Sequence, residues 1–318
     1  MADHLMYVAQ GKSATAATTP TNNNYGPKAI VRYLKRLKRA FRSKKFIFGT
    51  AILTFFILVA IIGPVFATNP NGFVGPDMAA PSLKFPLGTD FAGQNVLYQL
   101  IDATGPSLLV GFEAGALATL VSVVIGISSG LIGGIFDEAS TLFTNIVLVI
   151  PSLPLVIIVA AYAGSSGLTP TILVIAFTSW AAYARVLRGQ TLSIRNRDFI
   201  LASRISGEKL WRIVFMEILP NELAIIASNF IFMVVFAILT QATLAFLGIG
   251  DVSSLTWGNM LYLANNDEAL TSGAWWWFIP PGICIALVGT ALAFINFGLD
   301  EILNPRLKIA RRKDRHPK

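Results

Sequence analysis

Long apolar stretches alternate with polar segments along this chain. The stretches long enough to cross about 30 Å of hydrocarbon as a helix are residues 46–68, 107–135, 141–163, 170–187, 223–249 and 275–299. In lipid, a spanning segment must satisfy its own backbone hydrogen bonds, which a helix does. The pattern therefore predicts an all-α polytopic membrane protein with six transmembrane helices.

The polar segments differ in charge, and this difference predicts on which side of the membrane each one lies. Lys and Arg are concentrated in residues 28–45, 188–222 and 305–318, whereas residues 250–274 hold three acidic residues and no Lys or Arg. Cytoplasmic segments of membrane proteins are enriched in Lys and Arg. We therefore expect an N-in/C-in topology in which residues 188–222 form a cytoplasmic loop and residues 69–106 an external loop.

The two ends of the chain are predicted to be cytoplasmic. Residues 1–27 are rich in Ala, Thr and Asn without periodicity, which is typical of a disordered tail. Residues 28–45 form a basic juxtamembrane segment that either lies on anionic lipid or is a solvated flank of the first helix. Residues 305–318 form a basic tail. Between them, residues 107–304 hold the five remaining apolar stretches as one core.

Composition excludes several classes of function. The chain is 54% hydrophobic and 13% charged, whereas a soluble domain has about 25% charged residues. Its net charge of +8 is spread over three separate segments, so we expect no nucleic-acid partner. With only Cys284, His4 and His316 available and no phosphate-binding loop or nucleophile–base set, the sequence predicts no catalytic site, no metal site and no cofactor bound by this chain.

The polar interval 185–221 separates two apolar stretches and has its own helical periodicity. Apolar side chains at helical spacing are Phe199, Ala202 and Ile205 before Gly207, and Leu210, Ile213 and Val214 after it. A glycine between two helices permits a left-handed turn, and Pro220 favours the start of the next helix. We expect a rigid helix–turn–helix elbow outside the bilayer.

This interval resembles the cytoplasmic EAA loop of ABC-importer permease subunits. The matching residues are Ala202, Gly207, Leu219 and Pro220, whereas Leu201, Ser203 and Glu217 depart from the family pattern. Residues 86–90 (Pro-Leu-Gly-Thr-Asp), 242–250 and 255–261 resemble motifs of the dipeptide/oligopeptide/nickel branch. Beside these motifs, Gln94 and Asn95 replace the charged pair that follows the first one, and Gln241 replaces the Glu that precedes the second.

The resemblance implies a type I ABC importer permease fold in a prokaryotic inner or plasma membrane. Its implied partners are a homologous second permease subunit, two ATP-binding cassette subunits, an extracytoplasmic solute-binding protein and membrane lipid. ATP and Mg²⁺ would be held by the ATP-binding subunits. The solute could be a peptide, an oligosaccharide or a metal chelate, since specificity in this branch lies largely in the binding protein.

Two groups of residues are candidates for function. The resemblance implies that the elbow docks on the ATPase through Phe199, Ala202, Ser203, Ser206, Gly207, Glu208 and Trp211. Polar side chains within the apolar stretches are candidates for the translocation path, namely Glu113, Asn229, Thr240 and Gln241. We place Glu113 near the outer end of its span. Interhelical hydrogen bonds are an equally good interpretation of the three neutral residues.

Other patterns predict local structure. Gly126, Gly130 and Gly134 share one helix face, as a sliding contact between subunits or as static packing within one. Pro151 and Pro154 predict a kink. Thr89 or Asp90 is expected to cap a short helix. Residues 275–277, three tryptophans, predict an aromatic belt at the outer interface, with carbohydrate stacking as a weaker alternative.

The rival functions are a gradient-driven secondary transporter or channel, and a membrane-embedded enzyme. A secondary transporter is expected to carry paired ionisable residues near the membrane midplane. The predicted spans contain almost none.

Overall fold

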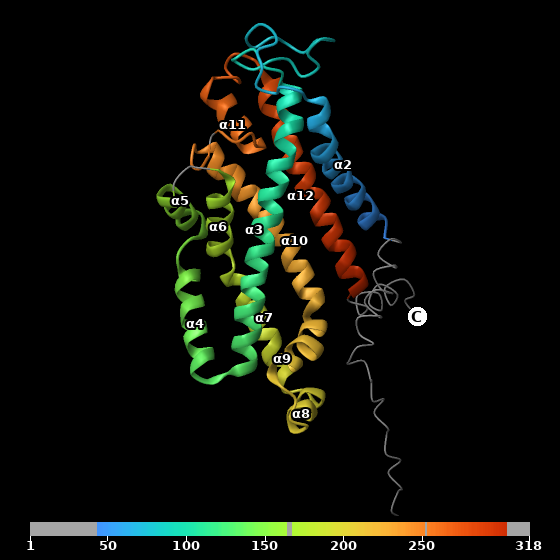
Figure 1. Cartoon of the computed structure of the whole chain (residues 1–318), viewed down its shortest axis with the longest axis vertical. Helices are drawn as coiled ribbons and strands as arrows, with labels where there is room; N and C mark the ends of the chain where they lie inside the picture. The colour runs from blue at the N-terminus through green and yellow to red at the C-terminus, as the bar shows by residue number, and fades with distance from the viewer. Residues whose placement is uncertain (1–42, 164–166, 252, 304–318) are drawn as a thin grey trace, which may run out of the picture.

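The computed structural model describes residues 43–163, 167–251 and 253–303 (Figure 1). Within these residues the chain is helical, and the extended structure is limited to two isolated β-bridges in one loop. The predicted tails 1–27 and 305–318, and nearly all of the basic segment 28–45, lie outside the described residues. The all-α prediction is confirmed for the part that the structure describes.

Four helices are long and apolar enough to cross a membrane, and two bent helix pairs raise the number to six. The long helices are α2 (Lys44–Phe66), α3 (Val96–Ile132), the continuous segment Leu210–Phe246, and α12 (Trp275–Leu303). In Figure 1 the loop 67–95 and the helix α11 (Trp257–Asn266) lie at one end of the molecule, and α8 (Asp198–Ile205) lies at the opposite end.

The predicted span 141–163 is not one kinked helix but two helices at a right angle. α4 (Gly134–Val149) and α5 (Ser152–Ala163) are bent by 90°. Ile150 between them has an extended backbone, with φ −77° and ψ 126°, because a residue before proline is disfavoured in the α region. Pro154 makes no break, since it lies in the first turn of α5, where its missing N–H is not needed.

The predicted span 170–187 is also divided. α6 (Leu168–Ser179) and α7 (Ala181–Arg195) meet at Trp180 with a bend of 43°. Ser122 donates a hydrogen bond to the Trp180 carbonyl at 2.8 Å, and Trp180 stacks on Phe143 of α4. α7 continues eight residues beyond position 187 to Arg195, so the predicted loop 188–222 begins inside a helix.

α3 is the central helix of the bundle and contacts α2, α6, α7 and α10 (Leu219–Phe246). A Cβ on Gly126 would lie 2.6 Å from the Ala184 carbonyl, and one on Gly130 would lie 2.7 Å from Thr191. These glycines therefore pack α3 against α7 within the subunit, as one of the two interpretations predicted. Gly134 is not on this face, because it lies beyond the end of α3 and opens α4.

The loop 67–95 is ordered rather than irregular, and we call it the cap. The Thr89 hydroxyl donates to the Pro76 carbonyl at 2.6 Å and accepts from the Ala79 N–H at 2.8 Å. Asp90 accepts from the Gln94 N–H and from the Gln99 side chain, at 2.8 and 2.7 Å, while burial raises the pKa of its carboxyl above the ordinary value. Both residues thus fix the loop instead of capping a helix.

Asn95 is the residue that caps α3, since its side chain accepts from the N–H groups of Leu97 and Tyr98. The helix therefore begins at Val96, within the region 69–106 predicted as a loop. The three tryptophans do not form a belt. Trp276 and Trp277 are buried, and Trp276 donates to the Thr89 carbonyl at 3.2 Å. Trp275 alone of the three is exposed.

Candidate functional site

The predicted elbow is present at the end of the molecule opposite the cap (Figure 1). α8 ends in a turn in which Gly207 has a left-handed φ of 73°. The Gly207 N–H donates to Arg204 at 3.0 Å and the Glu208 N–H donates to Ser203 at 3.1 Å, which is the hydrogen-bond pattern of a Schellman motif with glycine at C′. α9 (Leu210–Ile213) follows at once. The predicted left-handed turn at Gly207 is confirmed.

A π-helical turn, η1 (Val214–Ile218), joins α9 to α10. Pro220 lacks the N–H that the Met216 carbonyl would accept in an α-helix. The Leu219 N–H instead reaches back five residues to the Val214 carbonyl. The elbow therefore continues into the long apolar helix without a loop between them.

The inner face of the elbow packs on the last turns of α3. Ile200, Ile213 and Ile218 are buried together with Ile127 and Leu131. The apolar spacing of Phe199, Ala202 and Ile205 does not by itself show which face of α8 is buried. Ile200 is its buried residue, whereas Ala202 and Ile205 are exposed. In an eight-residue helix, two neighbouring faces fit the same apolar spacing, and α3 selects between them.

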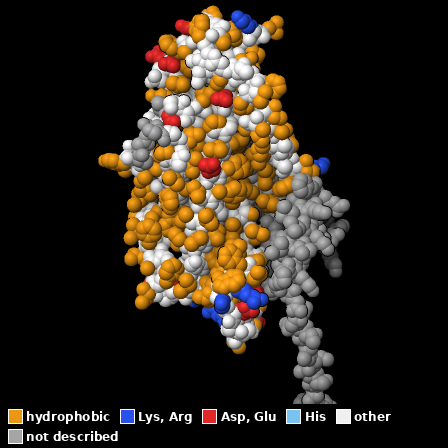
Figure 2. Space-filling view, viewed as in Figure 1, with side chains coloured by type: hydrophobic (Ala, Val, Ile, Leu, Met, Phe, Trp, Pro, Cys, Tyr) orange, Lys and Arg blue, Asp and Glu red, His pale blue; other side chains and the backbone are white. Residues whose placement is uncertain are grey.

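The outer face of the elbow is apolar and uncovered. Large hydrophobic side chains exposed on it are Leu201, Ile205, Leu210, Trp211, Phe215 and Met216. Ile205 is 87% exposed, although it lies in a polar segment at the tip of the molecule. Figure 2 shows basic side chains gathered at the same end. An exposed apolar patch with a charged rim marks a protein-interaction surface.

Two arginines fasten the elbow to α3. Arg195, at the end of α7, donates to the Gly130 carbonyl at 3.0 Å, and Arg204 of α8 donates to the Leu131 carbonyl at 3.1 Å. The last carbonyls of a helix have no partner within the helix and carry partial negative charge. The two guanidinium groups therefore act as a cationic cap, which we call the arginine clamp.

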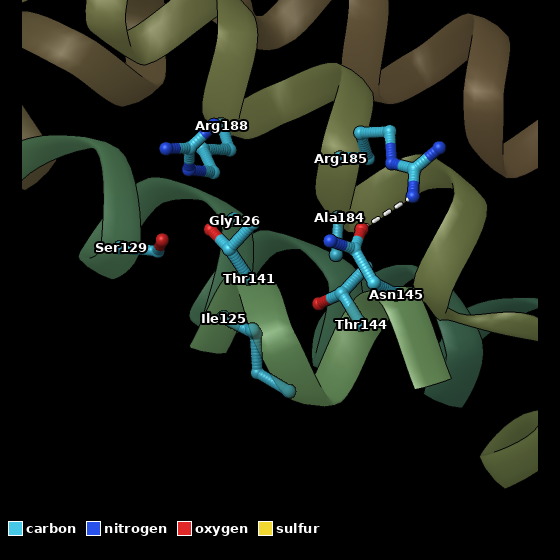
Figure 3. A pocket seen from close by; sticks show the side chains of 9 residues that line it. All are labelled: Ile125, Gly126, Ser129, Thr141, Thr144, Asn145, Ala184, Arg185 and Arg188. Carbon is cyan, nitrogen blue, oxygen red and sulfur yellow. Dashed lines mark hydrogen bonds between the residues drawn. The ribbon is translucent and has the colours of Figure 1, made fainter. Parts of the chain in front are cut away.

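The neighbouring α4 is fastened to α3 and α7 by a polar cluster around a cavity of about 120 Å³ (Figure 3). Arg188 forms a bidentate ion pair with Asp137 at 2.5 and 2.8 Å, and Ser129 donates to the same carboxylate. On the other side of the cavity, Arg185 donates to Asn145 at 2.6 Å. α3, α4 and α7 are thus linked by charged hydrogen bonds at the elbow end.

The predicted docking residues lie together on the elbow. Ala202, Ser206, Gly207 and Trp211 are exposed, whereas Phe199, Ser203 and Glu208 are partly buried. Ser203 donates to the Phe199 carbonyl at 3.1 Å, and Glu208 forms an ion pair with Arg212 at 3.3 Å.

Sequence reasoning missed part of this region. Ile205 and Phe215 are exposed apolar residues of a polar segment. Large apolar side chains in such a segment could have been recognised in the sequence as candidates for a contact surface. The contacts of the arginine clamp could not be predicted, because the sequence does not show which of its many arginines lie beside α3.

The four residues predicted for the translocation path do not form one site. Glu113 lies near the middle of α3, which begins eleven residues before the predicted span 107–135, and is exposed. Asn229, Thr240 and Gln241 are buried within the subunit on α10. Gln241 donates to Thr256 at 3.0 Å, and Thr256 caps α11. Gln241 thus serves packing inside the chain, as the alternative interpretation predicted.

Comparison with known proteins gives consistent matches. Residues 122–309 match the family described as the binding-protein-dependent transport system inner membrane component. The chain is 31% identical over 297 residues to the dipeptide transport system permease protein DppC of Alkalihalophilus pseudofirmus, which covers 91% of this chain and 96% of that protein. It is 33% identical over 274 residues to the oligopeptide transport system permease protein OppC of Bacillus subtilis, covering 84% of this chain and 88% of that protein.

Proposed function

This chain belongs to the family of binding-protein-dependent transport system inner membrane components, and we propose that the solute it carries is a peptide. It is a multi-pass protein of the cell membrane and the transmembrane permease subunit of an ABC importer. Its relatives are permease proteins of dipeptide and oligopeptide transport systems. These names favour a peptide over the oligosaccharide or metal chelate that the sequence leaves open.

The elbow is proposed to dock on an ATP-binding subunit, which would hold ATP and Mg²⁺. The observation that carries this proposal is the uncovered apolar face of Ile205, Leu210, Trp211 and Phe215 on the elbow, which lies at the end of the bundle opposite the loop 67–95. A surface of this kind is costly in water and is stabilised by burial against a partner, at about 25 cal/mol per Å² of apolar area. A homologous second permease, a second ATP-binding subunit and an external solute-binding protein complete the proposed assembly.

The arginine clamp gives this docking a mechanical consequence. When the ATP-binding subunits close on nucleotide, the elbow moves, and its hydrogen bonds to Gly130 and Leu131 move the end of α3 with it. Because the Arg188–Asp137 ion pair joins α4 to α7, these helices follow as one body. The thrust on the elbow is thereby converted into tilting of the membrane helices.

A gradient-driven secondary transporter or channel is not favoured. The matched family and the relatives are membrane components of binding-protein-dependent transport systems. That relationship is with permease subunits and not with ion-coupled carriers.

Uptake by cells tests the proposed solute. In a host whose other peptide permeases are deleted, removal of this chain should abolish uptake of radiolabelled tri-alanine, and a plasmid copy should restore it. Radiolabelled maltotriose serves as the control solute. Loss of maltotriose uptake with unchanged tri-alanine uptake would show that the solute is not a peptide.

A further inference from the structure

A carboxylate lies halfway along the apolar bundle, on an exposed face of α3. The packing of α3 against α10 gives the depth of Glu113, which is exposed. A Cβ on Gly111 would overlap the Ile238 side chain, and one on Gly115 would lie 2.9 Å from Val234. Glu113 lies between these two glycines in the sequence, so it is level with the middle of α10. The apolar stretch 223–249 is centred at this level, which places Glu113 near the middle of the membrane.

This carboxylate has no cationic partner within the part of the subunit that the structure describes. The ion pairs there are Arg188–Asp137 and Arg212–Glu208, and Glu113 takes part in neither. A charged side chain exposed to hydrocarbon is costly, so ionisable residues at this depth face a water-filled cavity or pair with an opposite charge. The exposed face of α3 around Glu113 therefore faces a wet path rather than lipid, and its charge calls for a cation.

An open apolar groove of about 410 Å³ runs between α3 and α10, beginning one helical turn from Glu113. The two helices lie side by side (Figure 1). The residues that line the groove include Ala116, Leu120 and Val123 of α3 and Leu223, Ala227 and Phe230 of α10. Residues three and seven positions apart share a helix face, so Glu113, Ala116 and Leu120 lie on the same face. Phe112 contacts Phe230, with ring centroids 6.3 Å apart, and this contact joins the groove to the turn that carries Glu113.

We propose that Glu113 binds the protonated α-amino group of the translocated peptide, while the groove between α3 and α10 holds its apolar side chains. A peptide carries a cationic end next to side chains of varied size, which matches a carboxylate next to an apolar groove in charge and in order. Hydrogen bonds between charged groups are roughly twice as strong as neutral ones, so one carboxylate can orient the peptide. The inference rests on the proposed peptide transport and specifies where this chain contacts the solute.

A helix of the second permease is the rival occupant of this groove. To neutralise Glu113, that helix would have to carry a Lys or Arg in its own apolar stretch, where basic residues are rare and costly. A peptide brings its ammonium group from water in each transport cycle and leaves with it. The charge of Glu113 therefore favours the solute.

Photocrosslinking in the complete importer identifies the occupant. Leu120→p-benzoylphenylalanine places a benzophenone in the groove, where Leu120 is 59% exposed. Illumination during ATP-driven uptake should attach radiolabelled tri-alanine to this chain. Phe55→p-benzoylphenylalanine, on α2 and equally exposed, is the matched control and should capture no radiolabel. Radiolabel no greater than in this control, or capture of the second permease in its place, would overturn the assignment.

The charge is tested separately. Glu113→Gln should lower the maximal rate of tri-alanine uptake, and the yield of the Leu120 crosslink, about tenfold, the effect of one hydrogen bond between charged groups. Glu113→Asp keeps the charge and should restore most of both. Glu138→Gln removes the same charge from an exposed position of α4 and should leave both unchanged.

Pull-down of the ATP-binding subunit and the second permease verifies that each variant assembles. Normal uptake in Glu113→Gln, an equal fall in Glu138→Gln, or loss of the second permease from Glu113→Gln would overturn the assignment while peptide transport stands. Failure of the wild-type importer to take up tri-alanine would instead overturn the proposed function, and the inference with it.

Discussion

Glycine is favoured at position 207 because of its backbone angle and not because a larger side chain would lack space. Its φ is 73°, and nothing lies within 4 Å of the position that a Cβ would occupy. The cost of another residue is therefore the cost of a left-handed conformation, which is of order 1–3 kcal/mol for residues that rarely adopt it. Asn tolerates this conformation far better than a β-branched residue does.

We expect Gly207→Val to leave the chain inserted and abundant in the membrane but to weaken its association with the ATP-binding subunit and abolish uptake. The strained turn would relax by rotating α8 relative to α9, which displaces Ala202 from Trp211. Immunoblotting of membranes and pull-down of the ATP-binding subunit measure the two effects.

Gly207→Asn is the matched control for this variant, and uptake should be largely retained. If Gly207→Val recovered the ATP-binding subunit and took up solute normally, the elbow would not be the coupling element.

Individual residues in the sequence predict where turns lie better than they predict which face of a helix is buried. Gly207 and Pro220 act through their own backbone chemistry, so their effects are local and readable. The buried face of α8 depends on α3, seventy residues earlier in the chain, which is why Ile200 was missed as its core residue. The start of α3 was missed as well, since Asn95 caps this helix well before the apolar stretch begins and thereby places Glu113 near its middle.

Among the elements, α8 is attached to α3 more directly than to the helix that follows it. Arg204 of α8 donates to the Leu131 carbonyl at the carboxyl end of α3 at 3.1 Å, beside the hydrogen bond from Arg195 of α7 to Gly130. Toward the following segment, Ser203 of α8 is 3.4 Å from Glu217 of η1, a longer contact. The buried link between Thr191 and Glu222 joins α7 to α10 at 2.8 Å. Motion of the elbow should thus reach α3 first.

Replacement of Arg204 by Gln should uncouple hydrolysis from transport. A hydrogen bond to a charged group contributes about 1.5–3 kcal/mol, so uptake per ATP hydrolysed should fall about tenfold. Docking itself should be retained, because the apolar outer face is unchanged. The measurement is the ratio of tri-alanine uptake to phosphate release in proteoliposomes that contain the complete importer.

Arg197→Gln is the control for this variant, since Arg197 is exposed and starts α8. It removes a charge from the same elbow without touching α3. A similar loss of coupling in Arg197→Gln would mean that the net charge of the elbow matters and that the clamp does not.

The broken helices show what a sequence predicts about elements. Pro151 predicts a bend, because proline constrains the residue before it. The angle of 90° is decided by the packing of α5 and α6 and cannot be read from Pro151. The bend at Trp180 has neither proline nor glycine, and it depends on Ser122 and Phe143 from distant helices. No local signal could have predicted it.

For the whole molecule, the charge pattern assigns an orientation that remains to be measured. The cap and the elbow lie at opposite ends of the bundle (Figure 1). Basic side chains gather at the elbow end (Figure 2), which predicts that this end is cytoplasmic. In a Cys284→Ala background, Leu83→Cys should react with a membrane-impermeant maleimide added outside intact cells. Leu83 is fully exposed in the cap.

Asn196→Cys, on the loop between α7 and α8, should react only after the cells are opened. Asn196 is exposed, so accessibility within the protein does not limit its labelling. Reaction of Asn196→Cys from outside intact cells would invert the predicted topology.

The uncovered face of the elbow also bears on the life of a chain that has not yet assembled. An orphan subunit displays Ile205, Trp211 and Phe215 to the solvent, the same kind of surface by which chaperones and quality-control proteases distinguish unfolded proteins. Binding of the partner buries that surface and shifts the chain toward its folded, protected state by mass action. The abundance of this subunit should therefore follow the supply of its partner, so that the surface used for assembly also sets the stoichiometry of the complex.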